Sequence, residues 1–486
     1  MVPLSYIITG VAIYTISLFI IGYIGLKRTK RTLEDFFLME RKMGWIVGAF
    51  TIAATLMSGV CFFGFAGLAY STGLALSLEY PALVVGWMLL YLLLAPKWWS
   101  LGREKKYITP SDYLYDRFGS NALRLLYSIV ILIMYIFTFI VIQLTAMGVA
   151  MSSLTGGTVP YWIGPVVGGL IMLGYILMGG YRAVVWTDVL QGMIMLASLW
   201  VVLIGAVMGS GGFETITSAL LKKDPTLLQI PGRFAFFSPN SWFSLFFAFT
   251  FFMFIVPQMV QRVYAMKSAK TVRLCGVLMG ILSILIVIPP LLIGLIGNIY
   301  YKLPPFSSKA DEVLGMLALK FFPEWFAVVV LCGALAAIMS TVDSLLLTAA
   351  SMITVDIYGP LRPKASEREK LLASEITLIA LVFLGTWLAL LRPAALTVMN
   401  ALAGTVAVSC LPTFVLAMYW ERINKLGAFS GMLLGFMAAI ILSFDFSTGR
   451  ILALSPIGPL QLFPSVYALI INFVFSVVVT YLTSHK

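Results

Sequence analysis

Apolar runs of about twenty residues follow one another along this chain and determine its fold class. A run of that length can cross a bilayer as an α-helix. We count thirteen such runs, near residues 5–26, 43–72, 74–96, 125–153, 161–179, 185–209, 238–263, 274–299, 322–356, 372–391, 394–420, 427–444 and 461–483. Only 11% of the residues are charged, against about 25% in an average soluble domain. The sequence therefore predicts an all-α polytopic membrane protein with about 13 transmembrane helices.

The positive charges are distributed unevenly between the loops. If the N-terminus lies outside and the loops alternate in side, 24 of the 32 Lys and Arg residues fall on the inner side. Such a bias orients membrane proteins, so the net charge of +12 reflects topology and does not indicate a nucleic-acid partner. We expect a plasma-membrane protein with a cytoplasmic C-terminus, surrounded by lipid and without an obligatory protein partner.

A polar cluster interrupts the ninth apolar run at residues 336–344 (AAIMSTVDS). A charged group such as Asp343 costs about 2.5–3.5 kcal/mol at membrane depth on insertion scales, so it usually faces a cavity, an ion or a partner. Helical spacing places four small or hydroxyl residues along one stripe, namely Ala337, Ser340, Thr341 and Ser344. Oxygen ligands on such a helix suit a small, hard cation such as Na⁺.

Two spans contain helix-breaking residues near mid-membrane, at 55–59 (TLMSG) and 254–258 (FIVPQ). Gly and Pro at this depth unwind or kink a helix, and freed carbonyls are tolerated only where they line a cavity. A structural alternative is that Gly59 permits close helix packing and Pro257 only bends its helix. Met57 and Ser340 both lie roughly 21–24 Å along their helices from the inner ends, so the first break and the hydroxyl cluster share one level.

The two breaks are five spans apart, which predicts an internal repeat. Residues 43–209 and 238–420 then form halves of opposite topology, because five is odd, within one membrane domain spanning 1–486. Residues 5–26 and 427–483 are peripheral. Interrupted helices at corresponding positions of inverted halves point to a transporter binding site.

Other function classes fit the sequence less well. Its one histidine, His485, is in the C-terminal tail, and its four cysteines lack metal-ligand spacing. Asp188 and Asp343 could form the dyad of an intramembrane protease, but no matching motif surrounds them, so we do not expect an enzyme. A channel needs repeated polar rings, whereas the polar residues here concentrate at one level. Proton coupling through Asp188, Asp343 or Glu79 remains an alternative to Na⁺.

Three stretches of the chain resemble motifs of the sodium/solute symporter family, which includes proline, pantothenate, sugar and monocarboxylate transporters. They are residues 35–38 (DFFL) with Arg41, Met43 and Gly44; residues 175–183 (YILMGGYRA); and residues 417–422 (AMYWER) with Gly427, Ala428 and residues 431–435 (GMLLG). The resemblance implies a LeuT-like fold, with a five-plus-five inverted repeat and flanking helices. It also implies import of a small organic solute with Na⁺ by alternating access.

The resemblance also implies a sodium site made of Ala54, Met57, Ala337, Ser340 and Thr341. Leu56 stands where the proline transporters of the family have an aspartate, which counts against proline and leaves Asp343 as a candidate charge nearby. Residues 55–58 align without gaps with pantothenate-type members. A carboxylate-bearing solute that resembles pantothenate, a monocarboxylate or an amino acid is therefore favoured, with proline and sugars as alternatives.

Further positions are expected to bind a second ion or the solute. A second ion or ion path is assigned to Asp188, Asp343 and Ser344, although Asp188 could instead pair with Arg182 or another inner arginine. The solute candidates are Cys61, Phe62, Glu79, Gln143, Phe247, Phe251, Phe254, Pro257 and Asn400. Against these assignments, membrane aromatics often face lipid, interhelical bonds satisfy buried amides equally well, and Glu79 could bond at the outer rim.

Overall fold

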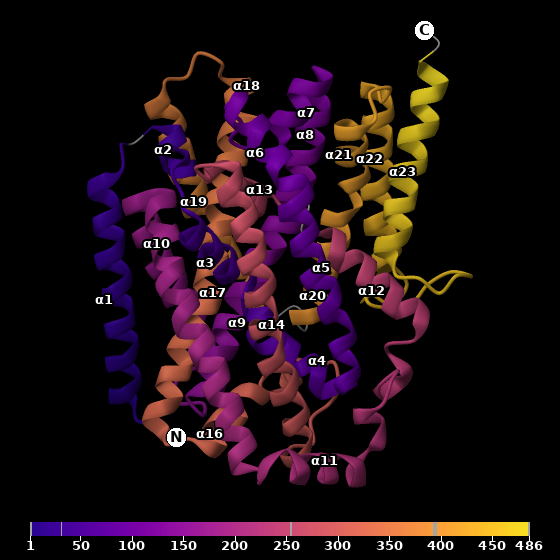
Figure 1. Ribbon diagram of the computed structural model, residues 1–486. Coiled ribbons are helices and arrows are strands. Elements are labelled where there is room, and N and C mark those ends of the chain that lie inside the picture. The colour runs from indigo at the N-terminus through magenta and orange to yellow at the C-terminus, as the bar shows by residue number, and fades with distance from the viewer. Residues whose placement is uncertain (1, 31, 253–254, 392–395, 485–486) are drawn as a thin grey trace.

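Long apolar helices cross the molecule from one end to the other (Figure 1). The computed structural model describes residues 2–30, 32–252, 255–391 and 396–484. In it, helix α1 begins at one end of the bundle and α23 finishes at the opposite end (Figure 1), as an odd number of crossings requires.

The first half of the chain forms the helices α1 (Leu4–Arg28), α2 (Leu33–Leu38), α3 (Trp45–Leu56), α4 (Phe65–Thr72), α5 (Tyr80–Leu89), α6 (Ala95–Glu104), α7 (Pro110–Phe118), α8 (Asn121–Val130), α9 (Thr138–Leu154), α10 (Ile163–Gly209) and α11 (Gly212–Lys223). The second half forms α12 (Pro239–Phe252), α13 (Pro257–Ala265), α14 (Ala269–Tyr300), α15 (Ser308–Asp311), α16 (Val313–Phe321), α17 (Glu324–Met352), α18 (Gly359–Leu361), α19 (Glu367–Leu390), α20 (Leu396–Ser409), α21 (Leu411–Tyr419), α22 (Lys425–Ser443) and α23 (Pro464–Thr483), with the antiparallel pair β1 (Phe444–Asp445) and β2 (Arg450–Ile451).

Short turns of other helical types complete the backbone. In the part of the chain that the structure describes, π-helical segments lie at Val60–Gly64, which leads into α4, and at Leu90–Leu94, Ile131–Phe137 and Ile353–Tyr358, each of which joins two α-helices. Within the described ranges, 3-10 turns lie at Met39–Arg41, Leu74–Glu79, Pro225–Leu228 and Arg233–Ala235.

The number of spans agrees with the sequence-based prediction. Eleven helical segments of the described chain are long and apolar enough to cross a membrane, and one bent pair adds a twelfth. Helix α10 has 47 residues, or about 70 Å, which is more than twice the roughly 30 Å hydrocarbon core of a bilayer. Counted as two spans, it brings the total to thirteen.

A single glycine divides α10, where the sequence predicted a short loop between two spans. Gly180 has φ 54° and ψ −144°, a conformation that favours glycine. A Cβ at this position would lie 2.7 Å from the Phe36 ring. Both the backbone turn and the close approach of α2 therefore require a residue without a side chain.

Both predicted helix interruptions are present. Helix α3 ends at Leu56, and the continuing helix from Val60 is tilted by 60° relative to it. The second interruption separates α12 from α13, which starts at Pro257, where a missing N–H is harmless because the first helical N–H groups have no partner inside the helix.

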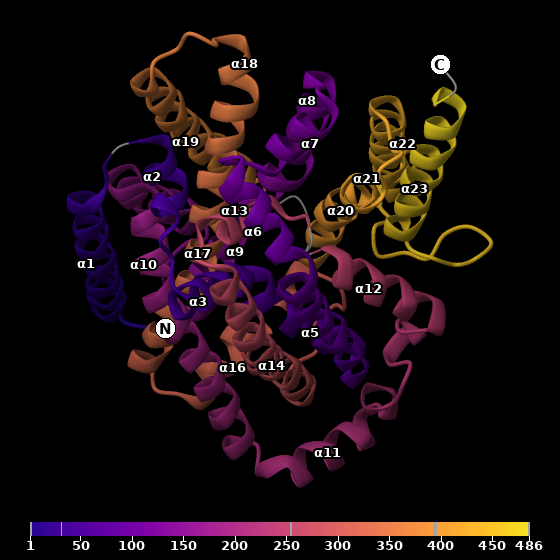
Figure 2. The same cartoon turned by 45° about the horizontal axis from the view of Figure 1, so that its top comes forward.

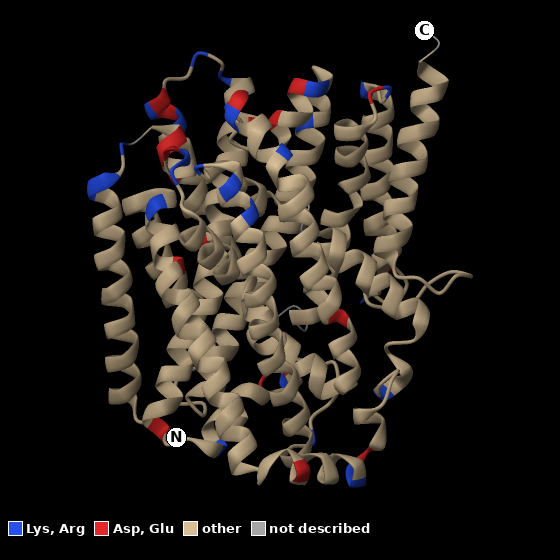
Figure 3. Cartoon of the chain, in the orientation of Figure 1, with Lys and Arg blue, Asp and Glu red and all other residues tan. Residues whose placement is uncertain are grey.

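Charged residues gather at the end of the molecule that carries α2, α7 and α18, with fewer at the end near α11 (Figure 3). Buried ion pairs join helices at the charged end. Arg182 lies 2.6 Å from Asp35, and Arg124 lies 2.6 Å from Asp112 and 3.0 Å from Asp356. Arg182 is thus already paired and is not the partner of Asp188. Helices α1 and α22–α23 lie at opposite edges of the bundle in the tilted view (Figure 2).

A buried carboxylate outside the spans should make stability depend on pH. Asp311 is 3% exposed, its Oδ2 accepts a hydrogen bond from the Leu396 N–H at 3.3 Å, and burial raises its pKa to about 7. Because the folded chain then binds this proton more tightly than the unfolded chain does, the free energy of unfolding falls as pH rises from about 4 to about 7. We expect Asp311→Asn, which keeps an acceptor oxygen, to reduce the loss of apparent Tm in detergent between pH 5 and pH 8.

The matched control is Asp445→Asn, because hydrogen bonds from Ser447 and Thr448 lower the pKa of Asp445 to about 2 and it does not titrate in this range. An Asp311→Asn variant with the same Tm difference between pH 5 and pH 8 as the parent chain would contradict the assignment.

Candidate ion and solute site

The first helix break meets the hydroxyl cluster of α17. Ser340 Oγ lies 2.9 Å from the Ala54 carbonyl and 3.1 Å from the Ala337 carbonyl, to which it donates. Thr341 Oγ1 lies 2.9 Å from the Thr55 carbonyl and 3.2 Å from that of Ala337. All five residues are at least 97% buried. Three carbonyls and two hydroxyls thus form one compact group of oxygen atoms.

The break itself makes these carbonyls available. Near the end of α3, the chain turns away at Met57, so the last carbonyls of the helix lack the N–H groups that a continuing helix would supply. The Ser58 N–H donates to the Leu56 carbonyl at 2.7 Å, which closes the turn, and the Gln143 amide oxygen accepts from the Gly59 N–H at 2.7 Å. Met57 is buried in this turn, and its carbonyl accepts no hydrogen bond from the described residues.

A second cluster, centred on Arg262 of α13, adjoins the first. Arg262 Nη2 lies 3.2 Å from Asp188 Oδ2, and its Nε donates to Thr51 Oγ1 at 3.1 Å. Arg262 also donates to Ser344 Oγ, and Thr51 donates to Asp188. Arg262 is 1% exposed and Asp188 is fully buried. The arginine therefore supplies the positive charge that a buried carboxylate requires.

Ser344 connects the two clusters. Its Oγ lies 3.0 Å from Thr55 Oγ1 and donates to Asp343 Oδ1 at 3.2 Å. The other oxygen of Asp343 accepts from the Tyr175 hydroxyl at 2.9 Å. The structure thus brings together the three residues assigned to a second ion or ion path, and adds Arg262, which sequence reasoning did not select.

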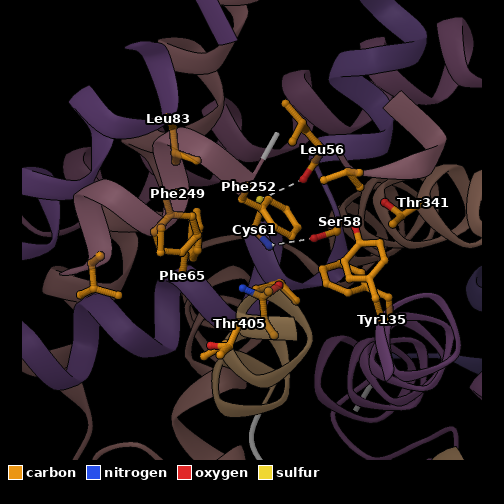
Figure 4. Close-up of a pocket in the computed structure, with 18 of the residues that line it drawn as sticks. Leu56, Ser58, Cys61, Phe65, Leu83, Tyr135, Phe249, Phe252, Thr341 and Thr405 are labelled. Carbon is orange, nitrogen blue, oxygen red and sulfur yellow. Dashed lines mark hydrogen bonds between the residues drawn. The ribbon is translucent and has the colours of Figure 1, made fainter. Parts of the chain in front are cut away.

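A pocket opens on the other side of the break (Figure 4). Its walls come from the broken helix and from α5, α9, α12, α13, α14, α17, α20 and α23, together with the segment Ile131–Phe137 and the chain before α23. No charged side chain is among the lining residues of the described chain. The polar lining residues are Thr55, Ser58, Cys61, Tyr135, Gln258, Ser283, Thr341, Asn400, Thr405 and Ser465.

Two of the predicted solute residues, Cys61 and Asn400, line this pocket. Gln143 does not line the pocket. Its amide oxygen instead accepts the hydrogen bond from the Gly59 N–H at the helix break. Glu79 does not line the pocket either. It is only 4% exposed, and its Oε1 has no hydrogen-bond partner among the described residues. Phe62 and Pro257 are buried beside the lining residues.

The phase of α12 decides which phenylalanines face the pocket. Leu245, Ala248, Phe249 and Phe252 form the lining stripe, with the spacing of one helix face. Phe247 and Phe251 lie off this stripe with their ring centroids 4.5 Å apart. Phe254 lies outside the described residues. An unbroken run of apolar residues has no polar face to reveal its phase, which is why the sequence did not identify Phe249 and Phe252.

Sequence reasoning also missed Tyr135, Gln258 and Thr405. Gln258 directly follows Pro257, so a buried amide at a predicted break was an available signal. Tyr135 lies in a continuous apolar run, where a single tyrosine carries no periodic signal.

Comparison with known proteins identifies the family. The model of the sodium:solute symporter family matches residues 36–435. The chain belongs to this family. The sodium/pantothenate symporter of Escherichia coli (strain K12) is 32% identical over 431 residues, covering 84% of each chain. The high-affinity proline transporter of Bacillus subtilis (strain 168) is 31% identical, covering 87% of this chain and 89% of the relative.

A solved structure shows the same fold. The substrate-bound outward-open state of a Na⁺-coupled sialic acid symporter superposes with a TM-score of 0.80 at 19% identity, covering 98% of this chain and 97% of the other. The symporter is thus a polytopic membrane protein with the LeuT-like architecture implied by its motifs. Because the proteins of this family are transporters rather than enzymes, its function is solute symport.

Breaking the buried ion pair of the second cluster should destabilise the symporter. Arg262→Gln leaves Asp188 buried without its cation, so we expect the free energy of unfolding to fall by about 3–5 kcal/mol. The double variant Asp188→Asn/Arg262→Gln should recover much of this loss, because neither charge then remains buried alone. SDS-induced unfolding in mixed micelles measures the free energy of unfolding of the parent chain and of both variants.

Arg233→Gln is the control, since the Arg233–Asp224 pair at 2.9 Å is partly exposed and its loss should change the free energy of unfolding by less than about 1 kcal/mol. An Arg262→Gln variant as stable as the parent would show that the buried pair is not needed.

Proposed function

We propose that this symporter imports a small, carboxylate-bearing organic solute together with Na⁺, by alternating access. The observation that carries the proposal is that Thr55 and Thr341 belong both to the oxygen cluster and to the pocket wall. An ion among the oxygens and a solute in the pocket would therefore contact the same two residues. In the proposed mechanism binding of either favours binding of the other, and the two effects are equal in size because coupling between binding sites is reciprocal.

The oxygen cluster suits Na⁺ better than a proton. Its members are backbone carbonyls and the hydroxyls of Ser340 and Thr341, which do not titrate near neutral pH, and carbonyls freed by broken helices coordinate Na⁺ in transporters. The proposed first site comprises Ala54, Met57, Ala337, Ser340 and Thr341. A hydroxyl that now donates to a carbonyl keeps its lone pairs, so it can serve as a ligand after a small rotation.

A second ion position, or the path by which the ion leaves, is proposed at Asp188, Asp343 and Ser344. Two features support it. Asp188 Oδ1 has no hydrogen-bond partner among the described residues, and Ser344 joins this group to the first site through Thr55. A cation there would compete with Arg262 for Asp188.

The solute class rests on relatives and on the pocket together. A relative at 32% identity carries pantothenate, and a carboxylate can be placed against the start of the helix that resumes at Val60, where the helix dipole is positive. With the N-terminus outside, the arginine-rich end of the molecule faces the cytoplasm of the cell, in agreement with the positive-inside rule.

Uptake into proteoliposomes tests the coupling ion. We expect radiolabelled pantothenate, or failing that lactate or proline, to accumulate under an inward Na⁺ gradient but not under a K⁺ or pH gradient alone. Ser340→Ala and Thr341→Ala each remove one ion ligand, so the Na⁺ concentration for half-maximal uptake should rise about tenfold, which is about 1.4 kcal/mol of ion binding.

Ser409→Ala is the control, because this buried α20 hydroxyl donates only to the Val406 carbonyl at 2.7 Å among the described residues. Accumulation driven by a pH gradient without Na⁺ would overturn sodium coupling. An Asp343→Asn variant with unchanged Na⁺ dependence would remove Asp343 from the ion sites.

A further inference from the structure

One pair of polar side chains in the pocket wall is only half satisfied by the protein. Gln258 Nε2 donates to the Tyr135 hydroxyl at 2.8 Å. Both residues line the pocket, and they are only 3% and 1% exposed. Tyr135 comes from the segment between α8 and α9, and Gln258 comes from the first turn of α13.

Each member of the pair retains one unused hydrogen-bonding capacity. The Tyr135 oxygen accepts the bond from Gln258, so its own proton is free to be donated. Gln258 Oε1 has no hydrogen-bond partner among the described residues. Buried polar atoms are nearly always hydrogen-bonded, so this pair requires one further acceptor and one further donor.

The surrounding side chains fix the pair but cannot satisfy it. The Tyr135 ring packs between Phe139 and Phe252, with centroid distances of 5.1 Å and 5.7 Å. The lining residues next to Gln258 along the chain are the apolar Val256, which precedes α13, and Met259. Figure 4 shows Tyr135 at the pocket, with Ser58 and Thr341 among the labelled residues nearest to it in this view. Among the described residues no side chain donates to Gln258 Oε1, so a molecule in the pocket can supply that donor and accept from the Tyr135 hydroxyl.

We propose that Tyr135 and Gln258 form the polar clamp that selects the solute. The Tyr135 hydroxyl donates to a carboxylate or carbonyl oxygen of the solute, and Gln258 Oε1 accepts from a solute hydroxyl or amide N–H. The solute class is accordingly a hydroxy- or amido-carboxylate, in which a donor and an acceptor lie a few bonds apart. This inference rests on the proposed function, since it assumes that the pocket holds the transported solute.

The clamp is also connected to the ion clusters. Arg262 Nη1 donates to the Gln258 carbonyl at 3.1 Å, one helical turn along α13, and the same guanidinium reaches Asp188 and Ser344. A solute held by Gln258 thus acts on the short helix whose next turn carries the buried cation. The nine-residue helix α13 therefore carries both Gln258, which contacts the solute in this proposal, and Arg262, which contacts the second cluster.

The chain contains a matched pair outside the pocket. Gln191 Nε2 donates to the Tyr14 hydroxyl at 2.9 Å, and Gln191 Oε1 likewise has no partner among the described residues. Neither residue lines the pocket. Gln191→Met therefore removes the same chemistry at a position where it cannot contact the solute. Tyr127→Phe is the second control, because Tyr127 donates to the Ile255 carbonyl at 3.3 Å and does not line the pocket.

The test uses pairs of probes that differ by one group. Affinities for the purified full-length symporter are measured by thermal shift and calorimetry in Na⁺ and in K⁺. The probes are pantothenate with pantothenol, which lacks the carboxylate, and L-lactate with propionate, which lacks the hydroxyl. We expect pantothenate or lactate to bind, and its counterpart to bind at least tenfold more weakly.

The variants assign each preference to a residue. Gln258→Met should bring the lactate and propionate affinities to within twofold of each other, whereas Gln258→Glu keeps an acceptor oxygen and should retain the preference for lactate. Tyr135→Phe should weaken pantothenate at least tenfold and abolish its advantage over pantothenol. Gln191→Met and Tyr127→Phe should leave every ratio unchanged.

Several results would overturn the clamp. These are equal binding of both members of each pair to the parent chain, an unchanged ratio in Gln258→Met, or no binding by any of the four probes. If Gln258→Met fails to fold, the affinity ratios of the parent chain and of Gln258→Glu still test the clamp. Binding ratios as expected but equal in Na⁺ and K⁺ would contradict sodium coupling alone, whereas Na⁺-dependent binding without these ratios would contradict the clamp alone.

Discussion

The symporter is organised around a helix that stops in the middle of the membrane. Hydrocarbon offers no hydrogen bonds, so each backbone group freed at the break between Leu56 and Val60 must find a partner inside the protein. Ser340 and Thr341 provide hydroxyls for the carbonyls, and Gln143 provides an amide oxygen for the Gly59 N–H. The break therefore dictates which polar residues the neighbouring helices carry.

The same requirement explains where the charges lie. A buried carboxylate needs a cation or strong donors. Asp188 forms an ion pair with Arg262, and Asp343 accepts a hydrogen bond from the Tyr175 hydroxyl. These residues join the oxygen cluster through Ser344, so polar groups form one continuous body inside an apolar bundle. Outside it, among the described residues, the helices in this part of the membrane present mainly apolar side chains to one another.

The sequence was most informative where hydropathy or backbone chemistry leaves a local mark. The spans follow from apolar run length, and the breaks follow from Gly59 and Pro257 within such runs. The meeting of Ser340 with the first helix break follows from the equal depth of Ser340 and Met57. Partners across helices leave no such mark. The pairing of Asp188 with Arg262 rather than Arg182, and the face of α12 that lines the pocket, depend on helix rotation about the axis, which a uniformly apolar sequence does not specify.

The pocket has a consequence for the energy source of transport. No charged side chain of the described chain lines it, and the protein returns to its starting state after each cycle, so its own charges make no net crossing. The electrical work of a cycle therefore equals the charge of the solute and its ions multiplied by the membrane potential. A monoanion travelling with one Na⁺ crosses as a neutral unit and draws only on concentration gradients. A second cation makes the cycle electrogenic, and the membrane potential then adds about 2.3 kcal/mol per 100 mV to accumulation.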